Sequence, residues 1–252
     1  MELNSYMEQG IHSIVRTVSA FYLNNGKGIR FMASFLPSAA KAARLRKNHE
    51  KDGLHVPPFL IASIASQCNL HCAGCYARAD GICSERSAEE MTAEDWKRVF
   101  DEAEELGVSF ILLAGGEPLL KRDIIELAAE HKGMVFPVFT NAVLMNDAYL
   151  DLFDDRRNLI PVISIEGSDI QTDLRRGEGV ARKISSGMAE LQKRGILFGV
   201  SVTVTNENVH TAVSEDYLNE LRQKGCGAVF YVEYVPAEKG TEHLVLSAED
   251  TQ

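Results

Sequence analysis

The sequence predicts an α/β fold built on a six-stranded parallel sheet. Two observations predict it: six short apolar segments alternate with amphipathic helical segments, and polar or turn-forming residues follow each apolar segment. Strands joined by helices at this spacing form right-handed βαβ units, and therefore a parallel sheet. A chain of 252 residues, 45% hydrophobic and 25% charged, can form one large soluble domain. Six units are too few for a closed eight-stranded barrel, which leaves a doubly wound sheet or an open partial barrel.

The predicted strands are short and apolar, and the predicted helices carry start and stop signals. The strands are residues 59–64, 109–113, 135–139, 159–163, 197–204 and 228–232. The helices between them are residues 91–106, 122–131, 147–153, 180–194 and 215–224. Thr92 and Asp95 have the spacing of a capping box at the start of the first helix. Gly195 and Gly225 end the last two helices.

Residues 1–56 are predicted to form a helical extension before a core of residues 57–236. Apolar residues at helical spacing mark a first short helix; they are Ile11, Ile14, Val15, Val18 and Tyr22. A second amphipathic pattern covers residues 30–44, where Pro37 is expected to divide the helix. Polar residues 48–53 resemble a linker. Residues 237–252 are expected to be a C-terminal tail or the start of a further segment.

The charge of −10 is distributed unevenly. Residues 1–56 hold eight Lys or Arg and four Asp or Glu, a net charge of +4, which leaves −14 for the rest. The acidic body argues against nucleic acid as a partner. The N-terminus lacks the basic and apolar regions of a signal peptide, and no apolar run is long enough to span a membrane, so we expect a cytoplasmic protein.

The basic, amphipathic character of residues 1–56 allows two roles. The segment could make a peripheral contact with an anionic membrane, with its apolar face buried in the interface. Alternatively, the same apolar face could pack on the barrel and close its open side. The second role is the more common fate of an amphipathic helix, and we favour it.

Three of the five cysteines, Cys68, Cys72 and Cys75, are spaced C-x3-C-x2-C directly after the first predicted strand. Such a loop can wrap three thiolates around one metal centre, and three thiolates suit a four-iron cluster with one open iron. A structural zinc site with Cys83 as a fourth ligand is the alternative. A disulfide framework is not expected, because the cysteine count is odd and no signal peptide precedes it.

Polar or turn-forming clusters also follow the other five predicted strands. They are residues 115–118, 140–141, 164–167, 203–206 and 234–236. Because functional groups of α/β folds gather beyond the C-terminal ends of the strands, we expect all of these clusters to share one rim with the cysteines. A zinc knuckle would not need the other five clusters, so their placement favours a catalytic site.

The cysteine motif and Gly115-Gly116-Glu117-Pro118 together resemble the radical S-adenosylmethionine (radical SAM) superfamily. The resemblance covers residues 57–236 and implies a six-stranded partial TIM barrel. It implies that Cys68, Cys72 and Cys75 ligate a [4Fe–4S] cluster whose open iron chelates SAM. It further implies that one electron cleaves SAM to a 5′-deoxyadenosyl radical, which abstracts hydrogen from a substrate.

The same resemblance implies roles for further residues. Gly115, Gly116, Glu117 and Pro118 correspond to the GGEP motif that holds the methionyl amine of SAM. Ser164 and Glu166 occupy the ribose-binding position, and Arg176 a position where relatives place an arginine near the SAM carboxylate. Relatives often have an aromatic residue just before the third cysteine. This chain has Gly74 there and Tyr76 just beyond, which we include among the SAM-binding residues.

The resemblance leaves the substrate and the catalytic residues unassigned. It implies a low-potential electron donor, similar to flavodoxin or ferredoxin. Relatives with auxiliary clusters in a SPASM or twitch domain carry many more cysteines, and we expect Cys83 and Cys226 not to be cluster ligands. The alternative function is a non-catalytic iron–sulfur or zinc-binding module with a structural or electron-transfer role.

Overall fold

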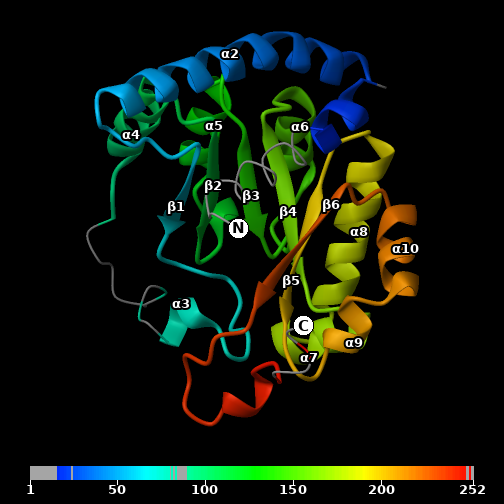
Figure 1. Ribbon diagram of the computed structural model, residues 1–252. Helices are drawn as coiled ribbons and strands as arrows, with labels where there is room; N and C mark the ends of the chain where they lie inside the picture. The colour runs from blue at the N-terminus through cyan, green and yellow to red at the C-terminus, as the bar shows by residue number, and fades with distance from the viewer. Residues whose placement is uncertain are drawn as a thin grey trace.

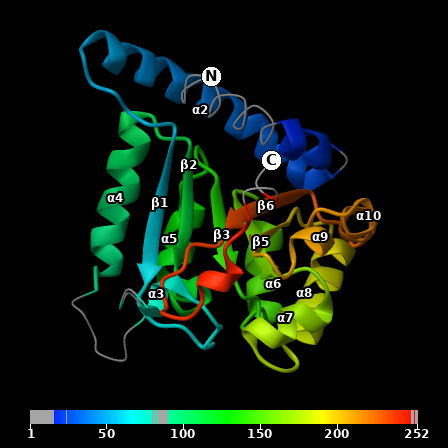
Figure 2. The ribbon, with the colours of Figure 1, turned by 60° about the horizontal axis from the view of Figure 1, so that its bottom comes forward.

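The computed structural model describes residues 16–23, 25–79, 81, 83, 90–247 and 250. Six strands form one sheet in the order β1-β2-β3-β4-β5-β6, and every neighbouring pair is parallel. The sheet is curved, and the helices that connect its strands lie along its outer face (Figures 1 and 2). A doubly wound sheet would carry helices on both faces. The predicted partial TIM barrel is therefore confirmed, and the doubly wound alternative is excluded.

The predicted strands and helices are present with small shifts at their ends. The strands are β1 Phe59–Ala65, β2 Phe110–Gly115, β3 Phe136–Thr140, β4 Leu159–Ile165, β5 Gly199–Val204 and β6 Ala228–Glu233. The connecting helices are α4 Ala93–Leu106, α5 Arg122–Glu130, α6 Asp147–Asp155, α8 Val180–Lys193 and α10 Glu215–Gln223. Short elements that the sequence did not predict are α3 Tyr76–Ala79, α7 Asp169–Arg176, α9 Val209–Ala212 and the 3-10 helices η1 Pro118–Leu120 and η2 Glu242–Leu244.

Alternation along each strand separates two environments. Outward residues such as Leu113, Val138 and Val200 join the helices in the main hydrophobic core. Inward residues line the concave face, where the Phe139 and Phe230 rings of non-adjacent strands meet at 5.6 Å between centroids. The sheet therefore has one packed face and one inner face.

Helix ends follow the predicted signals. The Thr92 hydroxyl accepts a hydrogen bond from Asp95 N at 3.2 Å, while the Asp95 carboxylate accepts from Thr92 N at 3.0 Å. The predicted capping box is thus present, and it satisfies two backbone groups that the first turn of α4 leaves free. Gly107 ends α4 with a φ of 92°, a conformation that glycine adopts without steric cost.

The extension differs from its prediction in two respects. Helix α2, Gly26–Lys51, is one continuous helix that contains Pro37, so the predicted division at this proline is wrong. Pro37 lies on the exposed side of α2, where water can satisfy the carbonyl that its missing N–H would have bonded. Residues 48–51, part of the predicted linker, belong to this helix. Residues 16–22 of the first predicted helix are helical, and its earlier part lies outside the described residues.

Helix α2 packs across the N-terminal ends of the strands (Figure 1). A second hydrophobic cluster joins Tyr22, Phe31 and Phe35 of the extension to Phe110 and Ile160 of the sheet. Tyr22 also donates a hydrogen bond to the Arg157 carbonyl at 2.9 Å. The favoured packing on the barrel is present, but it closes the base of the barrel and not its open side. No helix in the described part of the chain has the length and apolarity to cross a membrane.

Candidate active site

The cysteine loop follows β1 at the rim of the barrel opposite α2 (Figures 1 and 2). Two hydrogen bonds tie it to α7: Ala73 N donates to the Arg175 carbonyl at 2.9 Å, and Arg175 Nε donates to the Ala73 carbonyl at 3.1 Å. Within the loop, the Arg78 guanidinium donates to the Leu70 carbonyl at 2.8 Å. The loop backbone is therefore held from both sides at the centre of the cysteine motif.

The three thiols of the motif are partly buried. Burial raises the pKa of Cys68 to about 11 and also raises the pKa of Cys72, against the opposing effect of Arg176 and Arg175. A metal would have to displace these protons, because the thiolate is the ligand form of cysteine. Within the described residues, no three His, Cys, Asp or Glu side chains stand in metal-binding geometry. The ligand assignment therefore rests on the C-x3-C-x2-C spacing.

The Gly115–Pro118 motif lies directly beside the start of the cysteine loop. Gly116 N donates to the Ala65 carbonyl at 2.7 Å, and Glu117 N donates to the Gln67 carbonyl at 2.8 Å. A Cβ on Gly116 would collide with the Gln67 carbonyl. Glycine at this position thus allows the two backbones to approach closely enough to bond. The two motifs form one continuous surface.

The Glu117 carboxylate is buried and bonded within the protein. One oxygen accepts from Leu119 N at 3.0 Å and from the Thr140 hydroxyl at 2.6 Å, and the other accepts from Asn141 N at 2.8 Å. Burial raises the pKa of this carboxyl, while the three hydrogen bonds oppose the rise. Glu117 therefore joins the motif to the C-terminal end of β3. The backbone of the motif is the part that faces the cysteine loop.

Glu166 lies at the end of β4 with only 2% of its side chain exposed. Its Oε1 accepts from the Arg175 guanidinium at 2.6 Å and from Arg176. Its Oε2 is buried and has no donor among the described residues, and Arg176 Nε likewise has no acceptor there. A buried carboxylate oxygen without a donor is unfavourable unless a bound group supplies one. Glu166 Oε2 is therefore an acceptor that the described residues leave unused.

The structure brings the remaining predicted residues to the same rim in different ways. Ser164 lies on the inner face of β4, where its hydroxyl accepts from the Ser201 hydroxyl at 3.2 Å. Arg176 ends α7 and pairs with Glu166. Tyr76 begins α3 just after Cys75 and is more than half exposed. Arg176 therefore contacts the buried carboxylate of Glu166, Ser164 contacts β5, and the Tyr76 side chain is exposed.

Tyr234 is a site residue that the sequence analysis did not single out. It follows β6, it is buried, and its hydroxyl has no hydrogen-bond partner among the described residues. A Cβ on Gly74 would lie within 3.1 Å of three atoms of the Tyr234 phenol group. The ring thus fills the space beside the glycine of the cysteine loop. The only signal in the sequence was its place in the polar cluster after the sixth strand.

The two remaining cysteines differ in position. Cys83 Sγ lies near the GGEP motif, 3.0 Å from the point that a Cβ on Gly116 would occupy. Its exclusion from the ligand set remains a prediction, because the structure places it beside the loop. The Cys226 thiol donates to the Ala228 carbonyl at 3.1 Å, at the start of β6 and far along the barrel from the rim.

Comparison with known proteins identifies curated relatives in Methanosarcina barkeri. The chain is 30% identical over 155 residues to an Fe-coproporphyrin III synthase, covering 60% of this chain and 38% of the relative. It is 28% identical over 200 residues to an AdoMet-dependent heme synthase, covering 77% of this chain and 55% of the relative. The chain thus spans about half or less of the length of these relatives.

Among solved structures, the fold is similar to Streptococcus suis SuiB bound to the precursor peptide SuiA. The TM-score is 0.64 at 18% identity, over 82% of this chain and 46% of SuiB. This likeness concerns the fold alone. The family model of the radical SAM superfamily matches residues 63–221, which is more than half of the chain. The matched range includes the cysteine loop, the GGEP motif, and Glu166 with its two partners, Arg175 and Arg176. The chain belongs to the radical SAM superfamily.

Proposed function

We propose that the chain is the catalytic core of a radical SAM enzyme in which Cys68, Cys72 and Cys75 hold the cluster. The observation that carries the proposal is the physical connection of the motifs. The cysteine loop bonds through Gln67 to the GGEP motif and through Ala73 to α7. Three segments far apart in sequence therefore form one rim.

The cluster and SAM would supply the radical chemistry, and the protein would bind and orient them. The family's [4Fe–4S] cluster and SAM supply one-electron cleavage of a C–S bond and a 5′-deoxyadenosyl radical. We propose that the GGEP backbone receives the methionyl amine and that Arg176 lies near the SAM carboxylate. Glu166 Oε2 would accept a ribose hydroxyl, because it is the buried acceptor without a donor.

The inner face of the sheet is the proposed place for the substrate. The inward-facing strand residues are uncharged. They include Ile61, Ser63, Phe139, Ser201, Phe230 and Val232. Ile61 is 67% exposed, so this face is accessible in the chain as it stands. A substrate that covers this uncharged surface would exclude water from the radical. We propose that the substrate presents an apolar part here.

The relatives suggest two substrate classes for this chain. Two are named for porphyrin or heme synthesis, and SuiB is bound to a precursor peptide. The uncharged inner face is compatible with the apolar part of either. A low-potential donor, similar to flavodoxin or ferredoxin, would supply the electron. We propose a cytoplasmic location, where such donors are present.

The test is anaerobic reconstitution followed by incubation with SAM and dithionite. We expect about four iron atoms per chain and reductant-dependent 5′-deoxyadenosine. Cys72→Ala should lose the iron, whereas Cys226→Ala and Cys83→Ala should keep it. Cys226 is the matched control, because its thiol is also partly buried but lies at the other end of the barrel. Iron retained in Cys72→Ala would refute the ligand assignment.

The same experiment distinguishes the non-catalytic alternative. A structural or electron-transfer module would bind iron or zinc through the cysteines but form no 5′-deoxyadenosine under any reductant. If the wild-type chain forms 5′-deoxyadenosine, incubation with deuterated cell extract would then identify the substrate. The fraction that transfers deuterium into 5′-deoxyadenosine contains it.

A further inference from the structure

An open cavity with both charged and apolar lining residues lies at the base of the barrel, at the opposite end of the strands from the cysteine loop. Its volume is about 430 Å³, and it is bordered by α2, the turn between α5 and β3, and the turn between α6 and β4. Its charged lining residues are Lys27, Arg30, Lys132, Asp155, Arg156 and Arg157. The cavity therefore spans the junction between the N-terminal extension and the barrel, and it includes none of the proposed SAM-binding residues.

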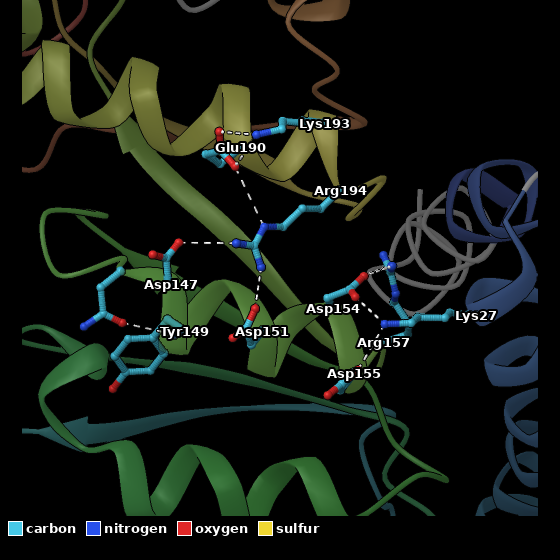
Figure 3. Close-up of polar contacts among 11 residues, drawn as sticks. Lys27, Asp147, Tyr149, Asp151, Asp154, Asp155, Arg157, Glu190, Lys193 and Arg194 are labelled. Carbon is cyan, nitrogen blue, oxygen red and sulfur yellow. Dashed lines mark hydrogen bonds and ion pairs between the residues drawn. The ribbon is translucent and has the colours of Figure 1, made fainter.

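Positive charge exceeds negative charge in this cavity. Lys27 pairs with Asp154 and Asp155, and Arg157 also pairs with Asp154, as the dashed lines in Figure 3 show. The other three basic lining residues form no ion pair within the described ranges; they are Arg30, Lys132 and Arg156. Asp154 and Asp155 are thus already engaged, and the basic lining residues exceed these two acids by three charges. Such a surplus attracts anions.

Arg157, although paired, is a buried part of the same charged lining. Its side chain is 3% exposed, one terminal nitrogen donates to the Gly195 carbonyl at 2.6 Å, and the other pairs with Asp154. Its Nε–H is buried and has no acceptor in the described part of the chain. The guanidinium also lies over the Tyr22 ring, with its Cζ 6.0 Å from the ring centroid, so Arg157 is held rigidly in the cavity wall and leaves Arg30, Lys132 and Arg156 to contact an anion.

We propose that this cavity binds a phosphate group that carries two or more negative charges. A single carboxylate would neutralise only one of the three surplus cations, whereas a phosphate offers several oxygens to arginine guanidinium groups. The first turn of α2 contains no acidic residue that would repel an anion, although the Asn25 side chain already accepts from its Lys27 and Gly28 N–H groups. The source is a phosphorylated small molecule or the headgroup of an anionic lipid.

Binding of an anion would link helix α2 to the barrel. The cavity joins Arg30 of α2 to Lys132 and Arg156 of the barrel, so one anion would contact both parts. It would hold α2 against the base of the barrel, where the same helix already covers the ends of the strands. Binding therefore stabilises the extension without touching the catalytic rim.

Pyrophosphate titration of the full chain tests the proposal, measured by calorimetry at constant ionic strength. The double variant Arg30→Gln/Lys132→Gln should bind pyrophosphate about tenfold more weakly than wild type. The control Lys41→Gln/Arg44→Gln removes the same charge from exposed positions of α2 outside the cavity, and should change affinity by less than about twofold. Surface residues are used because replacing the buried Arg157 would affect folding itself.

Vesicles of phosphatidylglycerol and phosphatidylcholine distinguish the two sources. Flotation that the Arg30/Lys132 variant abolishes and the control retains assigns the site to a lipid headgroup. Pyrophosphate binding without flotation assigns it to a soluble phosphate. Equal weakening in both double variants would mean diffuse attraction and would overturn the proposal. Absence of both pyrophosphate binding and flotation in the wild-type chain would overturn it too.

Discussion

The Tyr234 hydroxyl lies against Gly74, 2.6 Å from the point that a Cβ on this glycine would occupy. Gly74 has a φ of 65°, and Tyr234 is 3% exposed with no hydrogen-bond partner for its hydroxyl among the described residues. The contact joins the end of β6 to the cysteine loop. It places an unused hydroxyl donor beside the proposed cluster and SAM.

Tyr234→Phe should weaken SAM binding while leaving the free energy of unfolding almost unchanged. The hydroxyl has no hydrogen-bond partner among the described residues, so its removal should change the free energy of unfolding by less than about 1 kcal/mol. If the hydroxyl donates to a group bound at the rim, SAM should bind about tenfold more weakly to the reconstituted variant. Equilibrium titration with SAM and urea unfolding measure the two effects. A variant that binds SAM normally would show that the phenol only fills space.

Gly74→Ala tests the other side of this contact. Alanine would have to adopt a left-handed conformation and would collide with the Tyr234 ring, so we expect destabilisation of at least about 1 kcal/mol. Tyr234→Ala also loses a buried ring, but the double variant Gly74→Ala/Tyr234→Ala should be destabilised by less than the sum of the two single variants, because it removes the collision. Urea unfolding of the single and double variants measures this coupling. Simple additivity would show that the backbone conformation alone requires the glycine.

Glu117→Gln and Glu166→Gln, two isosteric changes, should have different effects. Glutamine at 117 would turn an amino group toward Asn141 N and lose a buried hydrogen bond, at a cost of about 1–3 kcal/mol in stability. Glutamine at 166 would replace an acceptor that has no donor among the described residues, and would also remove the charge that pairs with Arg175 and Arg176. It should therefore weaken SAM affinity by about tenfold in addition to lowering stability. Urea unfolding and SAM titration of both variants check this. The opposite pattern would exchange the two assigned roles.

Phe35→Ala tests whether α2 is part of the folded core. Phe35 is 1% exposed, and its ring contacts Phe31 and Phe110. Loss of this ring should destabilise the chain by about 3–5 kcal/mol. The neighbouring Leu36 is 48% exposed, so Leu36→Ala should change stability by less than about 0.5 kcal/mol. If thermal or urea unfolding is equally insensitive to both, α2 does not contribute to the cooperative core.

Glu90 links the start of the cysteine loop to the segment after η1, because it accepts from Ser66 and pairs with Lys121. The hydrogen bonds from Lys121 and Ser66 lower the pKa of Glu90 from 4.5 to about 2. A lowered folded-state pKa adds stability above the unfolded value, and that stability is lost as the pH falls from about 4.5 to about 2. The stability difference between wild type and Glu90→Gln should therefore be constant near neutrality and shrink across this window. Urea unfolding at several pH values measures it. A pH-independent difference would contradict the assigned pKa shift.

Local patterns in the sequence were enough to predict the order of elements. Alternating apolar segments predicted all six strands, and Thr92 with Asp95 predicted the start of α4, because these signals act between residues a few positions apart. The predicted break at Pro37 was wrong because the low helix propensity of proline is an average over many helices and takes no account of tertiary contacts. In this one the proline is on the exposed side, and the opposite face gains contacts with the barrel that hold the helix together.

By itself the sequence determined that this protein has a six-stranded parallel core with three closely spaced cysteines and a GGEP motif at its functional rim. Only the tertiary structure decided which partner each side chain has. It showed that the carboxylate of Glu117 is satisfied internally while that of Glu166 is not, and that Tyr234 fills the space beside Gly74. It also placed Lys132 and Arg156 opposite Arg30. Such contacts join residues far apart along the chain, so no spacing rule encodes them, and the packing of the whole barrel fixes them.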